Sequence, residues 1–191
     1  MISLVLTACT PKSTAEEATT RAAYLEAINA AYAKAGAQCI VYRQDQLGDL
    51  DPVRLAEVQP TINVLIKAQL VNVNPAQVQV PDPMGGTVTV KGVHVALSDL
   101  GNAAYKKDLG GFCFGDLKAD SITGTQTGQV GGKEVTTATY TYSLHNLANW
   151  ANVLTEIPDI QAATQGKTST GSALIAQTEH GYEATLIPAR Q

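Results

Sequence analysis

The sequence predicts an α+β fold, in which a helical N-terminal half packs with a small antiparallel β-sheet plus a helix in the C-terminal half. Residues 15–35 are dominated by Ala, Leu, Glu and Arg, which favour a helix. Valines alternate with polar residues between residues 78 and 97, and Thr alternates with Ala and Tyr between residues 137 and 142. Strict alternation is typical of strands, so we expect strands in these two segments, after the helical segment.

The composition favours an exported protein that has a packed core. The chain has 191 residues, which suits one domain of ordinary size or two small ones. Hydrophobic residues make up 45%, enough for a core, whereas charged residues make up only 16%, against about 25% in typical soluble domains. The net charge of −4 gives no general attraction to nucleic acid or to anionic lipid headgroups.

The first predicted helix covers residues 15–35. Ser13 and Glu16 have the spacing of a capping box, and Gly36 supplies a C-terminal stop. The apolar positions recur at spacings of three and four: Ala23, Tyr24, Ala27, Ile28, Ala31 and Ala35. We therefore expect one long amphipathic helix with a narrow, Ala-rich apolar face.

Two shorter helices are predicted next, after a short extended segment at residues 39–42. Asp51 followed by Pro52 is typical of a helix start, since Asp caps the helix and Pro fits its first turn. Pro60 then starts a separate third helix, which continues to Gln69.

A strand pair and a short helix complete the N-terminal half. Strands around residues 78–80 and 88–97 flank the turn-rich segment 81–86. Ser98 and Asp99 then cap a helix that runs to about residue 107.

This order of helices, strand pair and Pro/Gly-rich tip resembles a winged helix. The string at residues 66–71 resembles the end of a winged-helix recognition helix, and residues 94–101 resemble the second wing strand entering the next helix. The likeness covers residues 51–107, so residues 15–109 are expected to form a helical, winged-helix-like region.

A winged helix would imply DNA binding, but the residues argue against it. The helix predicted at residues 60–69 has a single basic residue, Lys67, and the wing tip has Asp82 and no basic residue. Several phosphate contacts require several Lys or Arg side chains. No nucleic-acid partner is therefore expected.

Residues 110–191 are expected to form the antiparallel sheet region. Their predicted elements are a strand at 117–125, a Gly-, Gln- and Thr-rich loop at 124–132, a strand at 135–144, a helix at 147–154, a helical turn at 158–164 and strands at 172–178 and 182–187. His180 and Gly181 form the candidate hairpin turn between the last two strands.

The N-terminus resembles the lipobox of bacterial lipoproteins. Leu6-Thr7-Ala8-Cys9 ends a short apolar run and precedes a polar segment. The resemblance implies cleavage before Cys9, acylation of Cys9 and attachment to the cell envelope. Residues 1–8 would then be a signal-peptide remnant, since no Lys or Arg precedes the apolar run, and residues 9–14 a lipidated tether. The alternative is a short apolar N-terminus with a chance cysteine.

The other two cysteines, Cys39 and Cys113, are predicted to form a disulfide. If Cys9 is acylated, they remain as an even pair in an oxidising compartment. The bridge would close a loop of roughly 75 residues, for which the chain-entropy model gives on the order of 4 kcal/mol. It would join the two predicted halves, and the alternative is two buried free thiols.

Three segments are similar to uncharacterised proteobacterial lipoproteins. These segments are residues 111–115, residues 140–142 and residues 147–151. The family has Phe-Cys-Tyr-Gly and Leu-Ala-Asp-Trp-Ala at these places, where this chain has Phe114 and Asn149 at the variable positions. The resemblance implies no activity. Thr10 after Cys9, in place of Asp, implies sorting to the outer membrane, facing the periplasm.

No catalytic residues, cofactor or metal site are predicted. The sequence lacks a nucleophile elbow, a phosphate loop and the spacings of zinc ligands. His94, His145 and His180 are expected to be ordinary surface or core residues. A nucleophilic set of Ser143, His145 and Asp116 can be imagined, but no spacing favours it.

A candidate binding surface is formed by Tyr140, Tyr142 and Trp150, although aromatic pairs on a strand more often serve packing. The sequence therefore predicts a lipid-anchored envelope protein that acts as a non-enzymatic binding module for a protein or another envelope component. The alternative is a periplasmic enzyme or a small-ligand carrier that uses the C-terminal sheet around the same three residues.

Overall fold

The computed structural model describes residues 14–188 and divides into two compact units. Within the described residues, unit 1 comprises residues 14–34, 119–142 and 170–188, and unit 2 comprises residues 35–118 and 143–169. Each unit therefore combines segments that are far apart in the sequence. Residues 1–13, with Cys9 and the predicted signal remnant and most of the tether, lie outside the described part.

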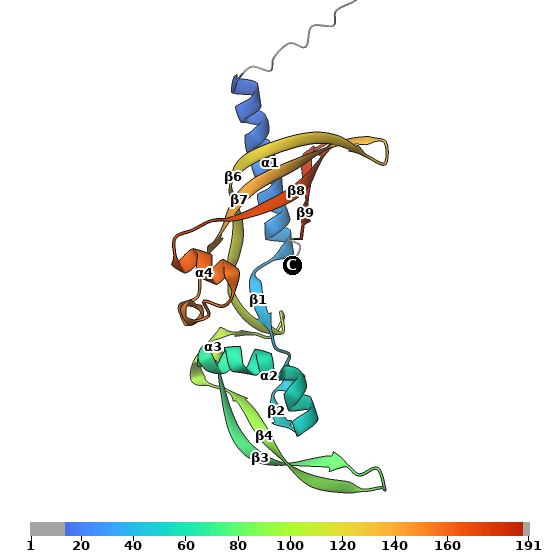
Figure 1. Ribbon diagram of the computed structural model, residues 1–191, viewed down its shortest axis with the longest axis vertical. Coiled ribbons are helices and arrows are strands. Elements are labelled where there is room, and N and C mark those ends of the chain that lie inside the picture. Colours follow the sequence, from blue (N-terminus) through green and yellow to red (C-terminus); the bar gives the residue numbers. More distant parts are fainter. Residues whose placement is uncertain (1–13, 189–191) are drawn as a thin grey trace, which may run out of the picture. The chain divides into compact units, whose positions relative to one another are not determined.

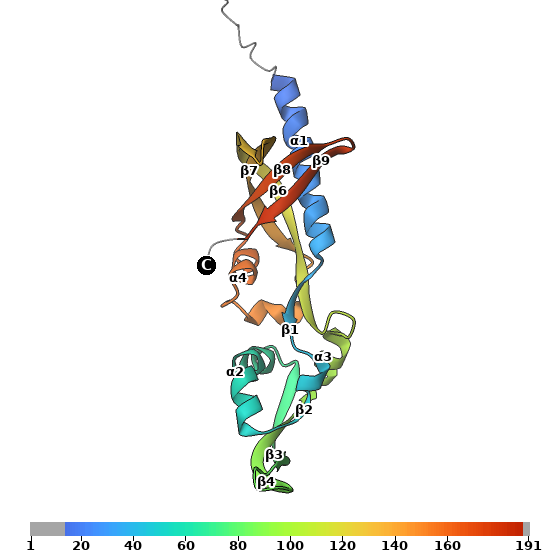
Figure 2. The same cartoon turned by 90° about the vertical axis from the view of Figure 1, so that its right-hand side faces the viewer.

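Unit 1 is built from the helix α1 and four strands (Figures 1 and 2). Its elements are α1 (Thr14–Ala35) and parts of β6 (Gly111–Val130), β7 (Lys133–His145), β8 (Ser169–Thr178) and β9 (Gly181–Ile187). α1 begins with Glu16 and Glu17 in its first turn, where carboxylates favour the helix dipole, and Gly36 follows its last residue at a φ of +82°. The predicted first helix is thus confirmed as an element.

The core of unit 1 lies between α1 and the strands and is small. Ile28 of α1 packs with Tyr140 and with three alanines of the strands, Ala119, Ala138 and Ala173. Tyr24 of α1 contacts Tyr182 of β9 edge-on, with ring centroids 4.8 Å apart. Asn29 pairs with both backbone groups of Ala119, which fixes α1 against β6.

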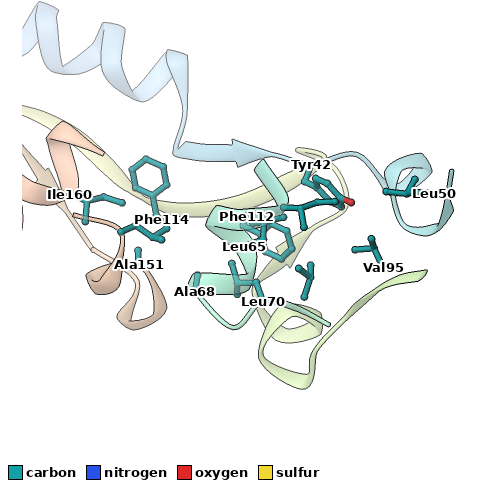
Figure 3. Packing of buried hydrophobic residues seen from close by; sticks show 13 residues of the cluster. Tyr42, Leu50, Leu65, Ala68, Leu70, Val95, Phe112, Phe114, Ala151 and Ile160 are labelled. Atoms are coloured by element: carbon teal, nitrogen blue, oxygen red, sulfur yellow. The ribbon is translucent and has the colours of Figure 1, made fainter. Parts of the chain in front are cut away.

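Unit 2 contains the other described elements: β1 (Gln38–Val41), η1 (Gln44–Gln46), β2 (Gly48–Leu50), α2 (Pro52–Lys67), β3 (Val71–Pro81), β4 (Thr87–Leu97), α3 (Asp99–Ala104), β5 (Tyr105–Lys106), η2 (Asn149–Val153) and α4 (Pro158–Thr164). One sheet has the strand order β2-β4-β3, and both β1 and β5 pair with β6. In Figure 3 the side chains of Tyr42, Leu65 and Phe112 lie together, with Phe114, Ala151 and Ile160 beside them. These bulky side chains make a dense core.

The fold class predicted from the sequence is wrong. Strands account for 47% of the structure and helices for 33%, and the larger sheet has the antiparallel order β1-β6-β7-β8-β9. The N-terminal half contains β1, β2, β3 and β4 and is not a helical, winged-helix-like half. A helix-turn-helix also needs two helices joined by a turn. Residues 52–67 instead form one continuous helix.

Pro60 explains why the sequence predicted two helices where the structure has the single helix α2. It lies inside α2, where the sequence predicted a new helix. An internal Pro removes a hydrogen bond and costs about 3 kcal/mol. Ile62 and Leu65, in the same helix, are fully buried, and each contributes about 1.5–3 kcal/mol. Core packing therefore outweighs the helix-breaking tendency of Pro60.

Two of the predicted helix caps, Asp51 and Ser98, are present, and the predicted strand pair is β3 and β4. Asp51 accepts hydrogen bonds from the backbone N–H groups of Val53 and Arg54, at 2.8 and 3.1 Å. Ser98 accepts one from Gly101, at 2.9 Å, and α3 follows it but ends at Ala104. These two start signals are therefore confirmed, although α3 is shorter than predicted, and Ser13, the predicted cap of the first helix, lies outside the described residues.

The disulfide between Cys39 and Cys113 is present. The two residues are register partners on the antiparallel strands β1 and β6. Both cysteines belong to unit 2, so the bridge constrains a single unit.

Two predictions for the C-terminal region are wrong in extent. The predicted loop at residues 124–132 is mostly strand, because β6 continues to Val130 and the turn is confined to Gly131 and Gly132, both with positive φ. The helix predicted at residues 147–154 is only the short 3₁₀ helix η2. By contrast, α4, β8 and β9 occur where they were predicted.

Among the described helices, none combines the length and hydrophobicity needed to cross a membrane.

Candidate functional site

A cavity of about 410 Å³ in unit 1 is the candidate site. Its lining comes from the C-terminal part of α1, from β7, from the start of β8 and from the end of β9: Tyr32, Tyr140, Tyr142, Thr170, Gly171, Ser172, Leu186, Ile187 and Pro188. The volume falls within the range of about 300–1,000 Å³ that is usual for small-ligand sites. We call this feature the tyrosine cavity.

The strand pairing explains why these residues meet. Tyr140 and Tyr142 are two positions apart on β7, and alternate residues of a strand share a face. β8 and β9 are antiparallel, with Ser172 opposite Ile187, so the start of β8 lies beside the end of β9. Tyr32 approaches from α1.

The three tyrosines form one continuous aromatic wall. The ring centroid of Tyr32 lies 6.2 Å from that of Tyr140 and 6.1 Å from that of Tyr142, and the centroids of Tyr140 and Tyr142 lie 6.2 Å apart. The Tyr32 and Tyr140 hydroxyls share a hydrogen bond of 3.0 Å. Burial raises the pKa of Tyr140, although the hydrogen bond with Tyr32 acts in the opposite direction. Tyr140 therefore remains a neutral phenol at physiological pH.

Gly171 makes room for this wall. A Cβ atom at this position would lie 2.7 Å from Cζ of Tyr140 and 2.8 Å from its hydroxyl oxygen. Real Cβ atoms essentially never approach heavy atoms this closely, so any larger residue would displace the Tyr140 ring. The glycine is therefore a condition for the observed position of Tyr140.

The polar groups of the cavity are hydroxyls. Thr170 and Ser172 contribute two, in addition to the phenols, and the lining residues within 14–188 include no carboxylate, ammonium or guanidinium group. Leu186, Ile187 and Pro188 supply an apolar side. This combination suits the binding of a neutral molecule that offers both apolar and hydrogen-bonding surface.

The structure brings together two of the three residues predicted for the binding surface. Tyr140 is buried and Tyr142 half-buried, and both line the tyrosine cavity. Trp150 instead lies in η2 of unit 2, where it packs edge-on against Phe112 with ring centroids 6.4 Å apart. It does not belong to the cavity lining.

The imagined nucleophilic set is only partly assembled. Ser143 Oγ lies 3.1 Å from His145 Nε2. Asp116 instead accepts a hydrogen bond from Asn146. His94 pairs with Asp49 at 2.6 Å, across the β2–β4 register, and the pair is exposed. No group of three or more His, Cys, Asp or Glu suited to a metal ion occurs among residues 14–188.

Sequence reasoning missed Tyr32, Thr170, Gly171 and Ser172. Tyr32 belongs to the helix and gives no signal of meeting Tyr140, 108 residues later. Gly171 did carry a signal, because an isolated glycine next to a predicted strand marks a close approach of other atoms. No protein-family model, curated protein or solved structure matches this chain significantly.

Proposed function

We propose that this chain is a non-enzymatic binding module of the bacterial cell envelope, anchored through acylated Cys9, and that the tyrosine cavity is its binding site. The cavity is the observation that carries the proposal. It offers three aromatic rings and hydroxyl groups in a volume suited to a ligand. The titratable groups among its described lining residues are phenols, and burial raises the pKa of Tyr140, so this lining is better suited to binding than to proton transfer.

Two observations support the location. Disulfides persist in oxidising compartments such as the periplasm, and Cys39 is bonded to Cys113. The lipobox-like residues 6–9 and the identity of Thr10 favour an anchor in the outer membrane, facing the periplasm. The proposed partner is therefore an envelope component.

Site-directed photocrosslinking in intact cells tests the binding site. A benzophenone amino acid is placed at Thr170, which is exposed and lines the cavity, and at Thr185 of β9, which is exposed but outside the lining. We expect adducts from position 170 and none from position 185. Equal adducts at both positions, or none at position 170, would contradict the proposed site.

Acylation is tested separately by labelling growing cells with an alkyne fatty acid. The label should attach to the chain and disappear in Cys9→Ala. Label retained in Cys9→Ala would refute the anchor.

A second candidate is a periplasmic small-ligand carrier or enzyme that uses the region around Tyr140, Tyr142 and Trp150. The ligand-sized volume of the cavity, about 410 Å³, favours the carrier, since a protein partner would prefer a flatter apolar surface. The crosslinking experiment separates the two functions. An adduct of small mass at position 170 supports the carrier, and an adduct with a macromolecule supports the binding module.

The 3.1 Å contact between Ser143 and His145 is the observation that favours an enzyme, and hydrolysis of model esters that is lost in Ser143→Ala would support it.

A further inference from the structure

The lining of the tyrosine cavity selects against charged ligands. The described part of the chain supplies it with phenols, aliphatic hydroxyls and apolar side chains and with no ionic partner. Burying an unpaired charge costs far more free energy than burying a paired one. An anionic or cationic group would therefore lose hydration in the cavity and gain no counter-charge.

The arrangement of the three rings determines whether a ligand can lie between them or only against them. A flat group held between two aromatic faces needs parallel rings about 7–8 Å apart, twice the usual contact distance between carbon atoms. The three centroid separations here are 6.1, 6.2 and 6.2 Å, and the ring planes are inclined by 45°, 54° and 81°. A ligand therefore lies on the aromatic wall rather than between its rings.

The hydroxyl groups select against purely apolar ligands. Among residues 14–188, neither the Thr170 nor the Ser172 side chain forms a hydrogen bond with another residue. An alkyl chain in the cavity would remove water from these hydroxyls without replacing its hydrogen bonds, which costs free energy at each group. The favoured ligand therefore carries hydroxyl or amide groups.

These three conditions together describe a sugar ring. We infer that the tyrosine cavity binds a neutral pyranose of a cell-envelope glycan, an inference that rests on the proposed function. One face of the ring presents C–H groups, which pack on the half-buried Tyr32 and Tyr142, since Tyr140 behind them is buried, and its edge presents hydroxyl groups, which pair with Thr170 and Ser172. The uncharged lining matches a neutral sugar.

Two other classes of ligand fit less well. A nucleobase would also lie on an aromatic wall, but proteins that bind single strands combine such walls with a basic groove. None of the described lining residues is basic, and the chain has a net charge of −4. A proline-rich peptide is extended and docks along an aromatic-lined groove, whereas the three tyrosine rings form one local cluster with centroids 6.1 to 6.2 Å apart. The glycan is therefore the best match.

Calorimetric titration of the full chain tests the inference. The two probes are the trisaccharide of N-acetylglucosamine and maltotriose, and a neutral proline decapeptide and octanol serve as competing classes. We expect one or both saccharides to bind. The double variant Thr170→Val, Ser172→Ala should weaken that binding about tenfold, since it removes two hydrogen bonds. Thr185→Val, outside the cavity lining, should leave the affinity unchanged.

A second pair of variants guards against a trivial loss of folding. Tyr142→Phe keeps the aromatic wall and should bind within about threefold of the original chain, whereas Tyr142→Leu should lose most of its affinity. Near-ultraviolet circular dichroism checks that each variant is folded.

The outcomes distinguish this inference from the proposed function. If neither saccharide binds, or if binding is insensitive to the Thr170 and Ser172 substitutions, the inference is overturned. Binding of the peptide or of octanol instead, together with specific crosslinks at position 170, would leave the proposed binding site standing with another ligand. Absence of those crosslinks would remove the proposed function itself.

Discussion

The two units are built from different kinds of core. In unit 2, large side chains such as Tyr42, Phe112 and Leu154 are fully buried, and a disulfide closes the unit. In unit 1, the buried strand residues include three alanines, and the described part of this unit contains no cysteine. A full-sized apolar side chain contributes about 1.5–3 kcal/mol on burial, whereas alanine contributes much less. Unit 2 is therefore the more strongly stabilised of the two.

The two units also differ in whether their core aromatic rings line the candidate binding site. Small residues on the strands let α1 approach closely, and five tyrosines belong to the core of unit 1 or pack against it: Tyr24, Tyr32, Tyr140, Tyr142 and Tyr182. Three of them, Tyr32, Tyr140 and Tyr142, also line the cavity. Unit 1 thus uses the same rings for packing and for the proposed site, whereas buried rings of unit 2, such as Tyr42 and Phe112, lie in its core.

Removal of the disulfide should have the largest effect and should act on unit 2. Cys39 and Cys113 are 74 residues apart, for which loop-closure entropy predicts a loss of about 4 kcal/mol in the free energy of unfolding of Cys39→Ala, Cys113→Ala. Urea unfolding followed by the fluorescence of Trp150, the single tryptophan, measures this loss, because Trp150 packs in unit 2.

Reduction of the original chain by dithiothreitol should reproduce the loss, and the double variant should not respond to the reductant. Hydrogen exchange should show that β1 loses more protection than the middle of α1. An equal loss in both places would mean that the stabilities of the two units do not differ as proposed.

Gly171→Ala should have the next largest effect and should act on unit 1. The added Cβ would collide with the ring of Tyr140, and such overpacking costs about 1–3 kcal/mol. Thermal unfolding and hydrogen exchange of β7 measure the effect. Gly128→Ala is the matched control, because that site has nothing within 4 Å and should be neutral or gain about 0.4–1 kcal/mol. If both variants behaved alike, the tight fit of Tyr140 would be refuted.

Tyr42→Phe should lower the stability of unit 2 only modestly at neutral pH, by less than the changes above, but should clearly alter its dependence on pH in the alkaline range. The Tyr42 hydroxyl donates a 2.7 Å hydrogen bond to the carbonyl of Gln46, worth about 0.5–1.5 kcal/mol. Burial raises the pKa of Tyr42 from 10.0 to about 12. Because the unfolded chain loses this proton first, stability that is present below pH 10 should be lost as the pH rises towards 12.

Phenylalanine cannot ionise, so Tyr42→Phe should flatten this alkaline loss, as measured by urea midpoints between pH 8 and 12. Tyr105→Phe is the control, since it removes a hydrogen bond to the carbonyl of Tyr42 while leaving the Tyr42 phenol in place. The variant and the control should therefore differ in slope, and identical slopes would exclude Tyr42 as the cause.

Local signals were predictable from the sequence. Asp51 and Ser98 cap helices as their types suggest, and Gly181 ends the predicted hairpin turn with a φ of +118°. Each of these features depends on hydrogen bonds or dihedral angles within a few residues. The pairing of Cys39 with Cys113 was also predictable, because it followed from compartment and number rather than from geometry.

Features that depend on distant partners were not predictable. Pro60 has the local signature of a helix start, but the burial of Ile62 and Leu65, which the local sequence does not reveal, keeps it inside α2. The glycines at 124–132 suggested a loop, but pairing with a neighbouring strand extends β6 to Val130. The candidate site was predicted only in part for the same reason. Tyr140 and Tyr142 were identified on their strand, whereas Tyr32 joins them only through the packing of α1.

The smallest effect is expected from the exposed ion pair of unit 2, between Lys67 at the end of α2 and Glu156. Their atoms lie 2.6 Å apart, and both side chains are nearly half exposed. The hydrogen bond from Lys67 lowers the pKa of Glu156, so the pair contributes stability above the ordinary carboxyl pKa and loses it as the pH falls through the lowered value. Solvent screening limits this contribution to less than about 1 kcal/mol. Lys67→Met should therefore shift the urea midpoint only slightly at pH 7 and not at all at pH 2, with Lys91→Met as a control elsewhere in unit 2. A large shift at pH 7 would mean that surface charge, and not the bulky core, distinguishes unit 2 from unit 1.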